Sequence, residues 1–426
     1  RPLPSPETPR HANRTPPLTT AAPPDGARLN GLSMAEFVTI IALMMALSAL
    51  AIDAMLPALP AISDHFALAG ANDRQLVVTA YLVGFALGQP IHGPLSDRYG
   101  RKPVLMAGLV LFAAGAALAA VADSFDMLLL ARTLQGLGVA AARVISNAVV
   151  RDCFSGREMA RVMSLAMMVF ITVPIIAPAV GAGILLVADW HSIFLVLLAM
   201  AGVTAAWVAL RLPETRDPAD RLPLSLPRLG EAARAVVRTR TTLGYTVALG
   251  LLFGILMAYI ATAQQIFGEI YGMGAEFPLF FAALALSVAA ASLTNAGLVS
   301  RFGMRRLSHI ALIGLVVLTT GMAVAGFPGR PSLVVLSLWL GAAFFCFGLV
   351  MANFNAIAME PLGRIAGMAA SFIGFLTTLL GAVGGWAIGQ AFDGSVRPLT
   401  IGFTFMAWSA LAVVLVTERG RLFGGR

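Results

Sequence analysis

The chain of 426 residues is 58% hydrophobic and only 12% charged, and its mean hydropathy is +0.85. Soluble globular proteins are about 45–50% apolar and about 25% charged, so this composition excludes a soluble enzyme and a disordered or fibrous chain. It indicates a membrane protein with several spans whose apolar side chains face lipid. The two cysteines, Cys153 and Cys346, cannot form a disulfide framework.

Residues 1–33 differ from the rest of the chain, because they are rich in proline and contain no apolar run. This composition predicts a disordered cytoplasmic tail. The segment is not a signal peptide, since it lacks the apolar core of such a peptide.

Twelve apolar runs follow, each close to the 20 residues that a helix needs to cross a bilayer. They cover residues 35–58, 76–95, 103–122, 127–149, 161–187, 191–210, 242–263, 278–298, 307–326, 332–356, 366–390 and 398–417. The runs are continuous and not alternating, which excludes a transmembrane β-barrel. We therefore expect an all-α membrane protein with twelve transmembrane helices.

The positions of lysine and arginine predict the orientation of these spans. Most of the basic residues between spans follow the even-numbered ones, where Arg98, Arg101 and Lys102 form one such group. Cytoplasmic loops carry this excess of positive charge, so both termini are expected in the cytoplasm. The net charge of +8 is then a topology signal, and no nucleic-acid partner is expected.

The spans divide into two sets of six. The longest polar stretch, 212–240, separates residues 34–211 from residues 241–417, and residues 418–426 form a short cytoplasmic C-terminal tail. The strings LSDRYGRKP (95–103) and LVSRFGMRR (298–306) occur at the same place in each half, which indicates duplication. Two such halves that rock about a central site are typical of transporters. Within the polar stretch, residues 228–238 form either a short interfacial helix or a basic linker.

Several strings resemble known motifs. GPLSDRYGRKP (93–103), LARTLQGLGVAAA (130–142) and PIIAPAVGAG (174–183) resemble motifs A, B and C of the major facilitator superfamily. LSALAIDAMLPALPAI (47–62), WHSIF (190–194) and LPET (212–215) resemble the Bcr/CflA group of drug–proton antiporters. The resemblance covers nearly the whole chain outside the tail, and it implies the two-half major facilitator fold and multidrug efflux. No motif specifies the substrate.

The resemblance also assigns roles within motifs A and C. In motif A it implies a conformational latch formed by Gly93, Asp97, Arg98, Gly100 and Arg101. In motif C it implies a hinge at Pro178 and Gly181. The motif C string departs from the wider antiporter pattern, because Val173, Ala177 and Ala182 stand where that pattern has glycine, which weakens it as independent evidence of antiport.

Asp53 is the only acidic residue near the middle of any predicted span. A charge at that depth costs roughly 2.5–3.5 kcal/mol on insertion scales, and a carboxyl group removed from water takes up a proton more readily. Asp53 is therefore the natural proton-coupling residue. The alternative is a permanent ion pair with an arginine.

Two arginines lie within the span 127–149. Arg132 and Arg143 are eleven residues apart, which places them on one face of a helix, and Gln135 and Asn147 flank that face. Because arginine keeps its charge, both side chains should point into the bundle. Arg132 resembles the motif B arginine, to which the family assigns proton coupling. Arg143 either lines the cavity or makes a contact between helices.

Candidate residues of a substrate cavity are few. They are Gln135, Arg143, Asn147, Tyr259, Phe345 and Asn353. A cavity with aromatic walls and few polar groups suits amphipathic compounds. The sequence contains no P-loop, no cluster of metal ligands and no pair of nucleophile and base, so we expect no enzyme, no metal and no cofactor.

Together these patterns predict a proton-coupled exporter of small amphipathic compounds in a bacterial inner membrane. Its expected partners are the small-molecule substrate, protons and membrane lipids, and we expect a monomer driven by the proton gradient. Two alternatives stay open at this point. One is an exporter of sugar or amino-acid-like metabolites with the same fold, and the other is a membrane sensor that transports nothing.

Overall fold

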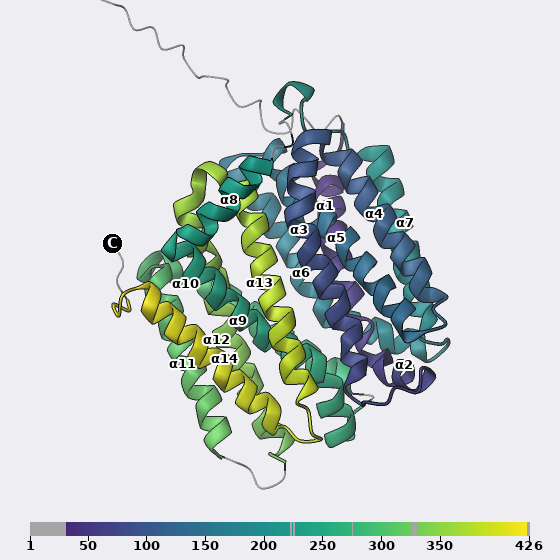
Figure 1. Cartoon of the computed structure of the whole chain (residues 1–426), viewed down its shortest axis with the longest axis vertical. Coiled ribbons are helices and arrows are strands. Elements are labelled where there is room, and N and C mark those ends of the chain that lie inside the picture. The colour runs from purple at the N-terminus through teal and green to yellow at the C-terminus, as the bar shows by residue number, and fades with distance from the viewer. Residues whose placement is uncertain (1–30, 222–223, 225, 275, 326–329, 424–426) are drawn as a thin grey trace, which may run out of the picture.

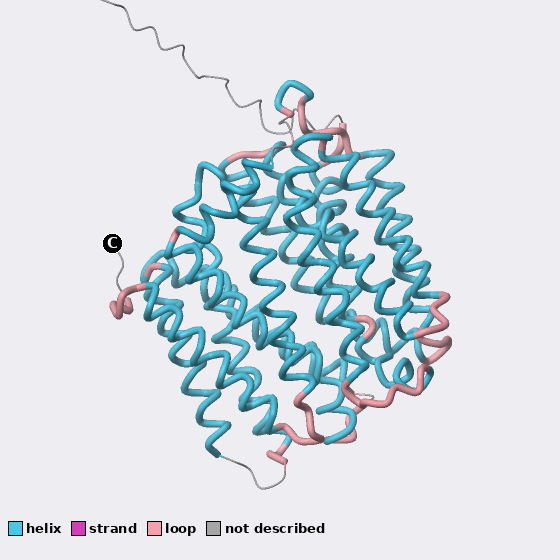
Figure 2. The backbone as a smooth tube through the Cα atoms, in the orientation of Figure 1, coloured by secondary structure: helices cyan, strands magenta, loops and turns pink. Residues whose placement is uncertain are grey.

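The computed structural model describes residues 31–423 except residues 222–223, 225, 275 and 326–329, and the tail predicted over residues 1–33 lies outside the described residues as far as residue 30. The described elements are all helical (Figure 2). The α-helices are α1 (Met34–Asp53), α2 (Leu59–His65), α3 (Leu76–Tyr99), α4 (Arg101–Ala120), α5 (Phe125–Cys153), α6 (Gly156–Leu185), α7 (His191–Arg211), α8 (Leu226–Arg238), α9 (Arg240–Gln264), α10 (Phe277–Phe302), α11 (Met304–Ala325), α12 (Leu333–Met359), α13 (Ala366–Gln390) and α14 (Arg397–Thr417). Short 3₁₀ or π-helical turns are η1 (Leu56–Ala58), η2 (Asp73–Gln75), η3 (Pro218–Asp220), η4 (Gln265–Ile270) and η5 (Glu360–Ile365).

Eleven helices in the described part of the chain are long and apolar enough to cross a membrane. They coincide with eleven of the twelve predicted spans. The remaining span, 161–187, falls on α6, a helix of 30 residues in which residues 172–185 are an apolar stretch. The prediction of an all-α membrane protein with several spans is confirmed.

The first predicted span, 35–58, is not one continuous helix. α1 ends at Asp53, and the chain continues through η1 into α2. Pro57 and Pro60 explain this break, because proline has no N–H to donate and its ring collides with the carbonyl group one turn earlier. The apolar pattern runs on through the break, which is why hydropathy alone predicts a single span.

The membrane-length helices form two bundles, which we call the first half (α1–α7) and the second half (α9–α14). In the first half, α3 and α4 pack against α5, and in the second half α9 packs against α12, α13 and α14. The halves meet where α3 lies along α13 and where α6 packs against α10. Figure 1 shows α3 and α13 side by side at the centre of the molecule.

Two ends of the bundle can be distinguished along the helix axes. α1 begins, α3 ends and α14 ends at the same end, which we call the terminal end. η2 and η4 lie at the opposite end. The segment between the halves contains α8 at the terminal end, so of the two interpretations of residues 228–238 the helix is confirmed. Its Ala232 and Val236 are buried, whereas Arg234 and Arg238 are exposed.

The contact between α3 and α13 depends on small residues. The Gln89 amide donates a hydrogen bond of 3.0 Å to the Thr378 hydroxyl. A Cβ atom on Gly374 would lie 2.1 Å from the Gln89 side-chain oxygen, so glycine is what lets this amide enter the interface. The two halves therefore share a buried polar contact where α3 lies along α13.

Candidate transport site

Asp53 lies where the first half breaks its first helix. The residue is 4% exposed, and within the described residues its carboxyl group makes no hydrogen bond and no ion pair. Removal from water without a partner penalises the ionised form of a carboxyl group. This is the property that a reversible proton carrier needs.

Helix α6 closes the site from one side. A Cβ atom on Gly181 would lie 1.8 Å from the carbonyl oxygen of Ala54, the residue next to Asp53. Only glycine permits so close an approach of a helix to the backbone at the break. Pro178, one turn before Gly181, is also buried. Gly181 of motif C thus lies directly against the residue that follows Asp53.

Arg132 lies close to the end of the same helix α1. Its guanidinium donates to the carbonyl oxygens of Ala51 at 2.9 Å and Val77 at 3.2 Å, and to the side-chain oxygen of Gln135 at 2.7 Å. Its carbon Cζ lies 4.5 Å from the centre of the Tyr81 ring. The helix ends after Asp53, so the Ala51 carbonyl has no helical partner and a positive charge is favourable there.

The structure therefore does not join Arg132 and Asp53 in an ion pair. Arg132 instead holds the backbone that carries Asp53. Gln135 is fully buried, and its side-chain oxygen accepts one of the guanidinium hydrogen bonds. Its amide nitrogen donates to no acceptor among the residues that the structure describes. The sequence analysis placed Gln135 beside the helix face that carries Arg132, and the hydrogen bond between the two side chains agrees with this placement.

Arg143 and Asn147 lie farther along α5. Arg143 is half-buried and Asn147 is exposed, and the Asn147 amide donates to the Arg143 carbonyl at 3.4 Å. Eleven helical residues extend about 16 Å, so Arg143 lies well toward the terminal end from Arg132. The structure does not bring these two residues to Asp53.

The second half contributes Tyr259 from α9. Its ring is 2% exposed and contacts Phe281 of α10 at 5.7 Å and Phe344 of α12 at 5.2 Å between ring centres. Its hydroxyl is buried and has no hydrogen-bond partner in the part of the chain that the structure describes. Tyr259 lies close enough to Asp53 to interact with it electrostatically, although the two residues belong to different halves.

The other two candidates of the second half lie on α12. Phe345 is half-buried and packs against the core, and it is its neighbour Phe344 that contacts Tyr259. Asn353 is buried and donates to the side chain of Asn295 on α10 at 2.6 Å and to the Leu349 carbonyl at 2.8 Å. This amide therefore joins α10 to α12.

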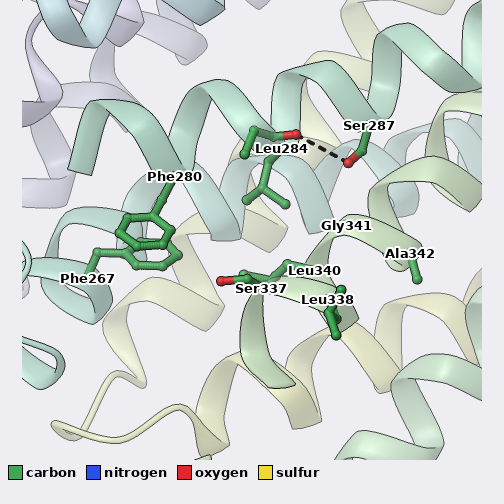
Figure 3. A pocket seen from close by; sticks show the side chains of 10 residues that line it. Phe267, Phe280, Leu284, Ser287, Ser337, Leu338, Leu340, Gly341 and Ala342 are labelled. Atoms are coloured by element: carbon green, nitrogen blue, oxygen red, sulfur yellow. Dashed lines mark hydrogen bonds between the residues drawn. The ribbon is translucent and has the colours of Figure 1, made fainter. Parts of the chain in front are cut away.

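A cavity of about 280 Å³ lies between α10 and α12 in the second half. Figure 3 shows the stacked rings of Phe267 and Phe280 at one end and the Ser337 hydroxyl beside Leu340. This hydroxyl has no hydrogen-bond partner within the described segments. Leu340 lies one turn from Phe344, so the cavity adjoins the aromatic rings around Tyr259. Its walls come from one half only, which separates it from the interface at Asp53.

Motif A forms a compact ion cluster at the terminal end. Arg101 is 2% exposed and lies 2.8 Å from both Asp97 and Asp152. It also donates to the Ser96 hydroxyl at 2.7 Å. Arg98, by contrast, is exposed. The cluster ties α3, α4 and α5 of the first half together.

The turn between α3 and α4 depends on Gly100, whose φ of +103° lies in a region that side chains with a Cβ rarely adopt. A Cβ atom there would lie 2.4 Å from a carboxylate oxygen of Glu214. Gly93, two turns earlier on α3, faces the Ser371 hydroxyl of α13, which a Cβ on Gly93 would approach to 3.0 Å. Of this motif, Gly93 is thus the residue that lies against the second half.

Sequence reasoning missed the role of Glu214. Its two carboxylate oxygens accept the backbone N–H groups of Arg101 at 2.8 Å and Lys102 at 3.1 Å. These are orphan donors of the first turn of α4, and a negative charge is stabilising at that position. The LPET string, noted only as a family resemblance, contains this carboxylate.

The second half has a corresponding cluster. Arg305, near the start of α11, lies 3.3 Å from both Glu360 and Glu418. Ser300 stands in this half at the position that Asp97 occupies in the first half. The structure shows that acids from the ends of α12 and α14 supply the charge instead.

A second group that the sequence did not reveal joins the halves at the opposite end. The Asn72 amide donates to the carbonyl oxygens of Gln390 at 3.1 Å and Phe392 at 2.8 Å. The Gln75 amide donates to Gln265 at 2.6 Å, and the Gln265 amide donates to Asn72 at 2.9 Å. We call Asn72, Gln75, Gln265 and Gln390 the amide network. Amides scattered over loops and helix ends have no periodic pattern that could have predicted it.

An ion pair between Arg74 of η2 and Glu269 of η4 flanks the amide network. The Arg74 side chain is 7% exposed and the Glu269 side chain is 47% exposed. The halves are therefore fastened at this end by amides on the inside and by one ion pair toward the surface.

These features define a class of protein. Two helical halves meet around a buried acid, ion clusters hold the helix ends of each half, and polar contacts fasten the halves at one end. This is the construction of a membrane transporter built from repeats. The sequence profile of the Major Facilitator Superfamily matches residues 41–385, and the chain belongs to this superfamily.

Relatives with assigned names include drug-resistance proteins. The chain is 32% identical to an uncharacterized MFS-type transporter, YdgK, of Bacillus subtilis, with 81% of this chain and 86% of the relative covered. It is 29% identical to a bicyclomycin resistance protein homolog of Haemophilus influenzae, with 90% and 96% covered. The resemblance to the Bcr/CflA type is thereby confirmed.

A solved structure supports the same fold. The human organic anion transporter MFSD10 superposes with a TM-score of 0.70 at 19% sequence identity, over 90% of this chain and all of that chain. At this identity the likeness concerns the fold alone. The chain is a transporter of the major facilitator fold with several membrane spans.

Proposed function

We propose that the protein exports small amphipathic compounds from a bacterial cell in exchange for protons, by alternating access of one site at Asp53. The observation that carries the proposal is the buried carboxyl group of Asp53, placed where the halves meet and without a partner among the described residues. The relative named as a bicyclomycin resistance protein homolog supports the substrate class. The excess of arginine at the terminal end supports a cytoplasmic position for both termini.

In this cycle, residues 34–211 and 241–417 move as the two halves. Asp53 is ionised when the site faces the cytoplasm and substrate binds. When the site faces outward, a proton reaches Asp53 and weakens the hold on the substrate. One proton moving through 100 mV releases about 2.3 kcal/mol. At about 1.4 kcal/mol per tenfold, this sustains roughly a fifty-fold gradient of substrate for each net charge moved.

The test is the replacement Asp53→Asn, which keeps the shape of the side chain and removes its ionisation. We expect this variant to reach the membrane and to lose efflux driven by a pH gradient. Ethidium efflux and bicyclomycin resistance are measured in a strain without other exporters, followed by ethidium flux in proteoliposomes with and without a pH gradient.

The matched control is Asp64→Asn, because Asp64 lies eleven residues further on, in α2, and is exposed. We expect it to transport like the unaltered protein. Undiminished proton-driven pumping by Asp53→Asn would remove Asp53 from the mechanism. A failure of the unaltered protein to respond to the pH gradient would refute proton exchange itself.

A further inference from the structure

Two buried polar groups from opposite halves lie near each other, and neither has a hydrogen-bond partner among the described residues. One is the Asp53 carboxyl group at the end of α1, and the other is the Tyr259 hydroxyl of α9. α9 packs against η1, the turn that follows Asp53, so the two elements are in direct contact. Tyr259 also interacts electrostatically with Asp53. Buried polar groups are seldom left unpaired without a functional reason.

The other described polar side chains near Asp53 already donate hydrogen bonds to other acceptors. Tyr81 of α3 also interacts electrostatically with Asp53, but its hydroxyl donates to the Ser48 carbonyl at 3.0 Å. Arg132 of α5 places each of its nitrogen atoms on another acceptor. α6 presents the backbone of Gly181, and its described side chains bring no charge to this point. Tyr259 is thus the tyrosine near Asp53 whose hydroxyl donates to no other described acceptor.

The ring of Tyr259 is held in position for this task. Phe281 stacks against it and Phe344 meets it edge-on, so the ring is clamped between α10 and α12. A clamped ring loses little entropy when its hydroxyl forms a new hydrogen bond. The second half therefore offers one oriented donor to the carboxyl group of the first half.

We propose that Tyr259 is the residue by which the second half detects the ionisation of Asp53, its hydroxyl donating to the carboxylate when that group is ionised and unoccupied. The inference rests on the proposed function. The hydrogen bond holds α9 against the break in α1, near the opposite end of the bundle. A substrate with a cationic or donor group displaces Tyr259 from the carboxylate and frees the halves to move. Protonation of Asp53 removes the acceptor in the same way.

The test uses the full chain, purified in detergent, with ethidium as the probe. Binding is measured by fluorescence anisotropy between pH 6 and pH 9. We expect the affinity to rise with pH as Asp53 ionises. In Tyr259→Phe the midpoint of this rise moves upward by about one pH unit, which is the shift expected from losing one hydrogen bond to a charged group.

Two further variants decide the interpretation. Tyr81→Phe removes a hydroxyl that also interacts electrostatically with Asp53 but already donates to the Ser48 carbonyl, and we expect its midpoint to equal that of the unaltered protein. In an Asp53→Asn background the affinity no longer depends on pH, and adding Tyr259→Phe changes it less than about twofold, because the two residues act as one pair. A structural role of Tyr259 would alter the affinity in both backgrounds.

The proposal is overturned if Tyr259→Phe keeps the original midpoint, or if its effect persists in the Asp53→Asn background. Size-exclusion chromatography of each variant checks that the fold is intact. Failure of the exporter function is a separate result, because it appears as absent proton-driven ethidium flux by the unaltered protein in proteoliposomes. The binding midpoints are measured without any gradient and do not depend on that flux.

Discussion

Gly181, which has no side chain, determines how closely α6 approaches the backbone beside Asp53. Gly181 brings α6 to within van der Waals distance of the Ala54 carbonyl, and a Cβ atom there would lie 1.8 Å from that oxygen. Any larger residue must push α6 away from the break in α1 or shift the carbonyl itself. Asp53, the preceding residue, moves with that carbonyl.

We therefore expect Gly181→Ala to lower the free energy of unfolding by about 1–3 kcal/mol, the usual cost of overpacking a close contact, and to reduce efflux. Gly183→Ala is the matched control, because a Cβ atom there meets nothing within 4 Å. The control should be neutral or slightly stabilising. Thermal unfolding in detergent and ethidium efflux per molecule are measured. Equal behaviour of the two variants would show that the close contact is unimportant.

For single residues, the sequence predicts a buried acidic residue better than it predicts which groups pair with it. Asp53 stands out because one carboxyl group in an apolar run is expensive. An ion pair with Arg132 was the natural alternative, since charge is visible in a sequence. In the structure, Arg132 donates instead to the carbonyl oxygens of Ala51 and Val77. Such backbone acceptors cannot be recognised from the sequence, because every residue has a carbonyl group.

The start of α4 shows how an element is stabilised from a distance. Glu214, which follows α7, accepts the N–H groups of Arg101 and Lys102 and places a negative charge at the helix N-terminus. Lys102 in turn donates from its ammonium group to the Ala209 carbonyl near the end of α7, at 2.7 Å. The start of α4 and the segment at the end of α7 thus supply hydrogen-bond partners to each other beside the motif A turn.

Glu214→Gln is expected to lower the free energy of unfolding by about 1–2 kcal/mol, because the amide keeps the shape but loses the charge that favours the helix N-terminus. Glu231→Gln serves as the control, since Glu231 is exposed on α8 in the same segment between the halves. The variants are compared by thermal unfolding at low and high salt. A loss as large for Glu231→Gln would point to the net charge of the segment and not to the helix end.

The elements divide into those that hydropathy predicts and those that it does not. Apolar runs of membrane length became helices, because lipid leaves the backbone no partner except itself. The break after Asp53 and the π-helical turn η4 were missed, since both lie within or beside continuous apolar sequence. Pro57 and Pro60 were visible, but prolines are also tolerated inside membrane helices, as Pro90 and Pro94 of α3 show.

In the whole molecule, the described hydrogen bonds between the halves gather at the opposite end. They comprise the amide network and the ion pair of Arg74 with Glu269, and one further bond joins Gln89 to Thr378 in the contact between α3 and α13. The sequence predicts two halves from the central polar stretch. It does not predict which end is fastened, because that depends on amides from three separate segments.

Opening toward the opposite end must break these contacts, since each links the first half to the second. The amide network contains no titratable group, so its closure does not depend directly on pH. In the proposed cycle the proton acts at Asp53 instead. Each net amide hydrogen bond contributes only about 0.5–1.5 kcal/mol. A network of this size is strong enough to favour one state and weak enough for substrate binding to reverse it.

Covalent fastening of the same end should therefore stop transport while leaving the fold intact. Asn72→Cys and Gln390→Cys place one thiol on each half, in a background where Cys153 and Cys346 are replaced by alanine. Treatment with a short bis-methanethiosulfonate crosslinker is expected to abolish ethidium efflux, and dithiothreitol should restore it. Each single cysteine variant, treated in the same way, should keep its activity. Continued efflux by the crosslinked protein would mean that the halves need not separate at the amide network, and alternating access about Asp53 would have to proceed by another movement.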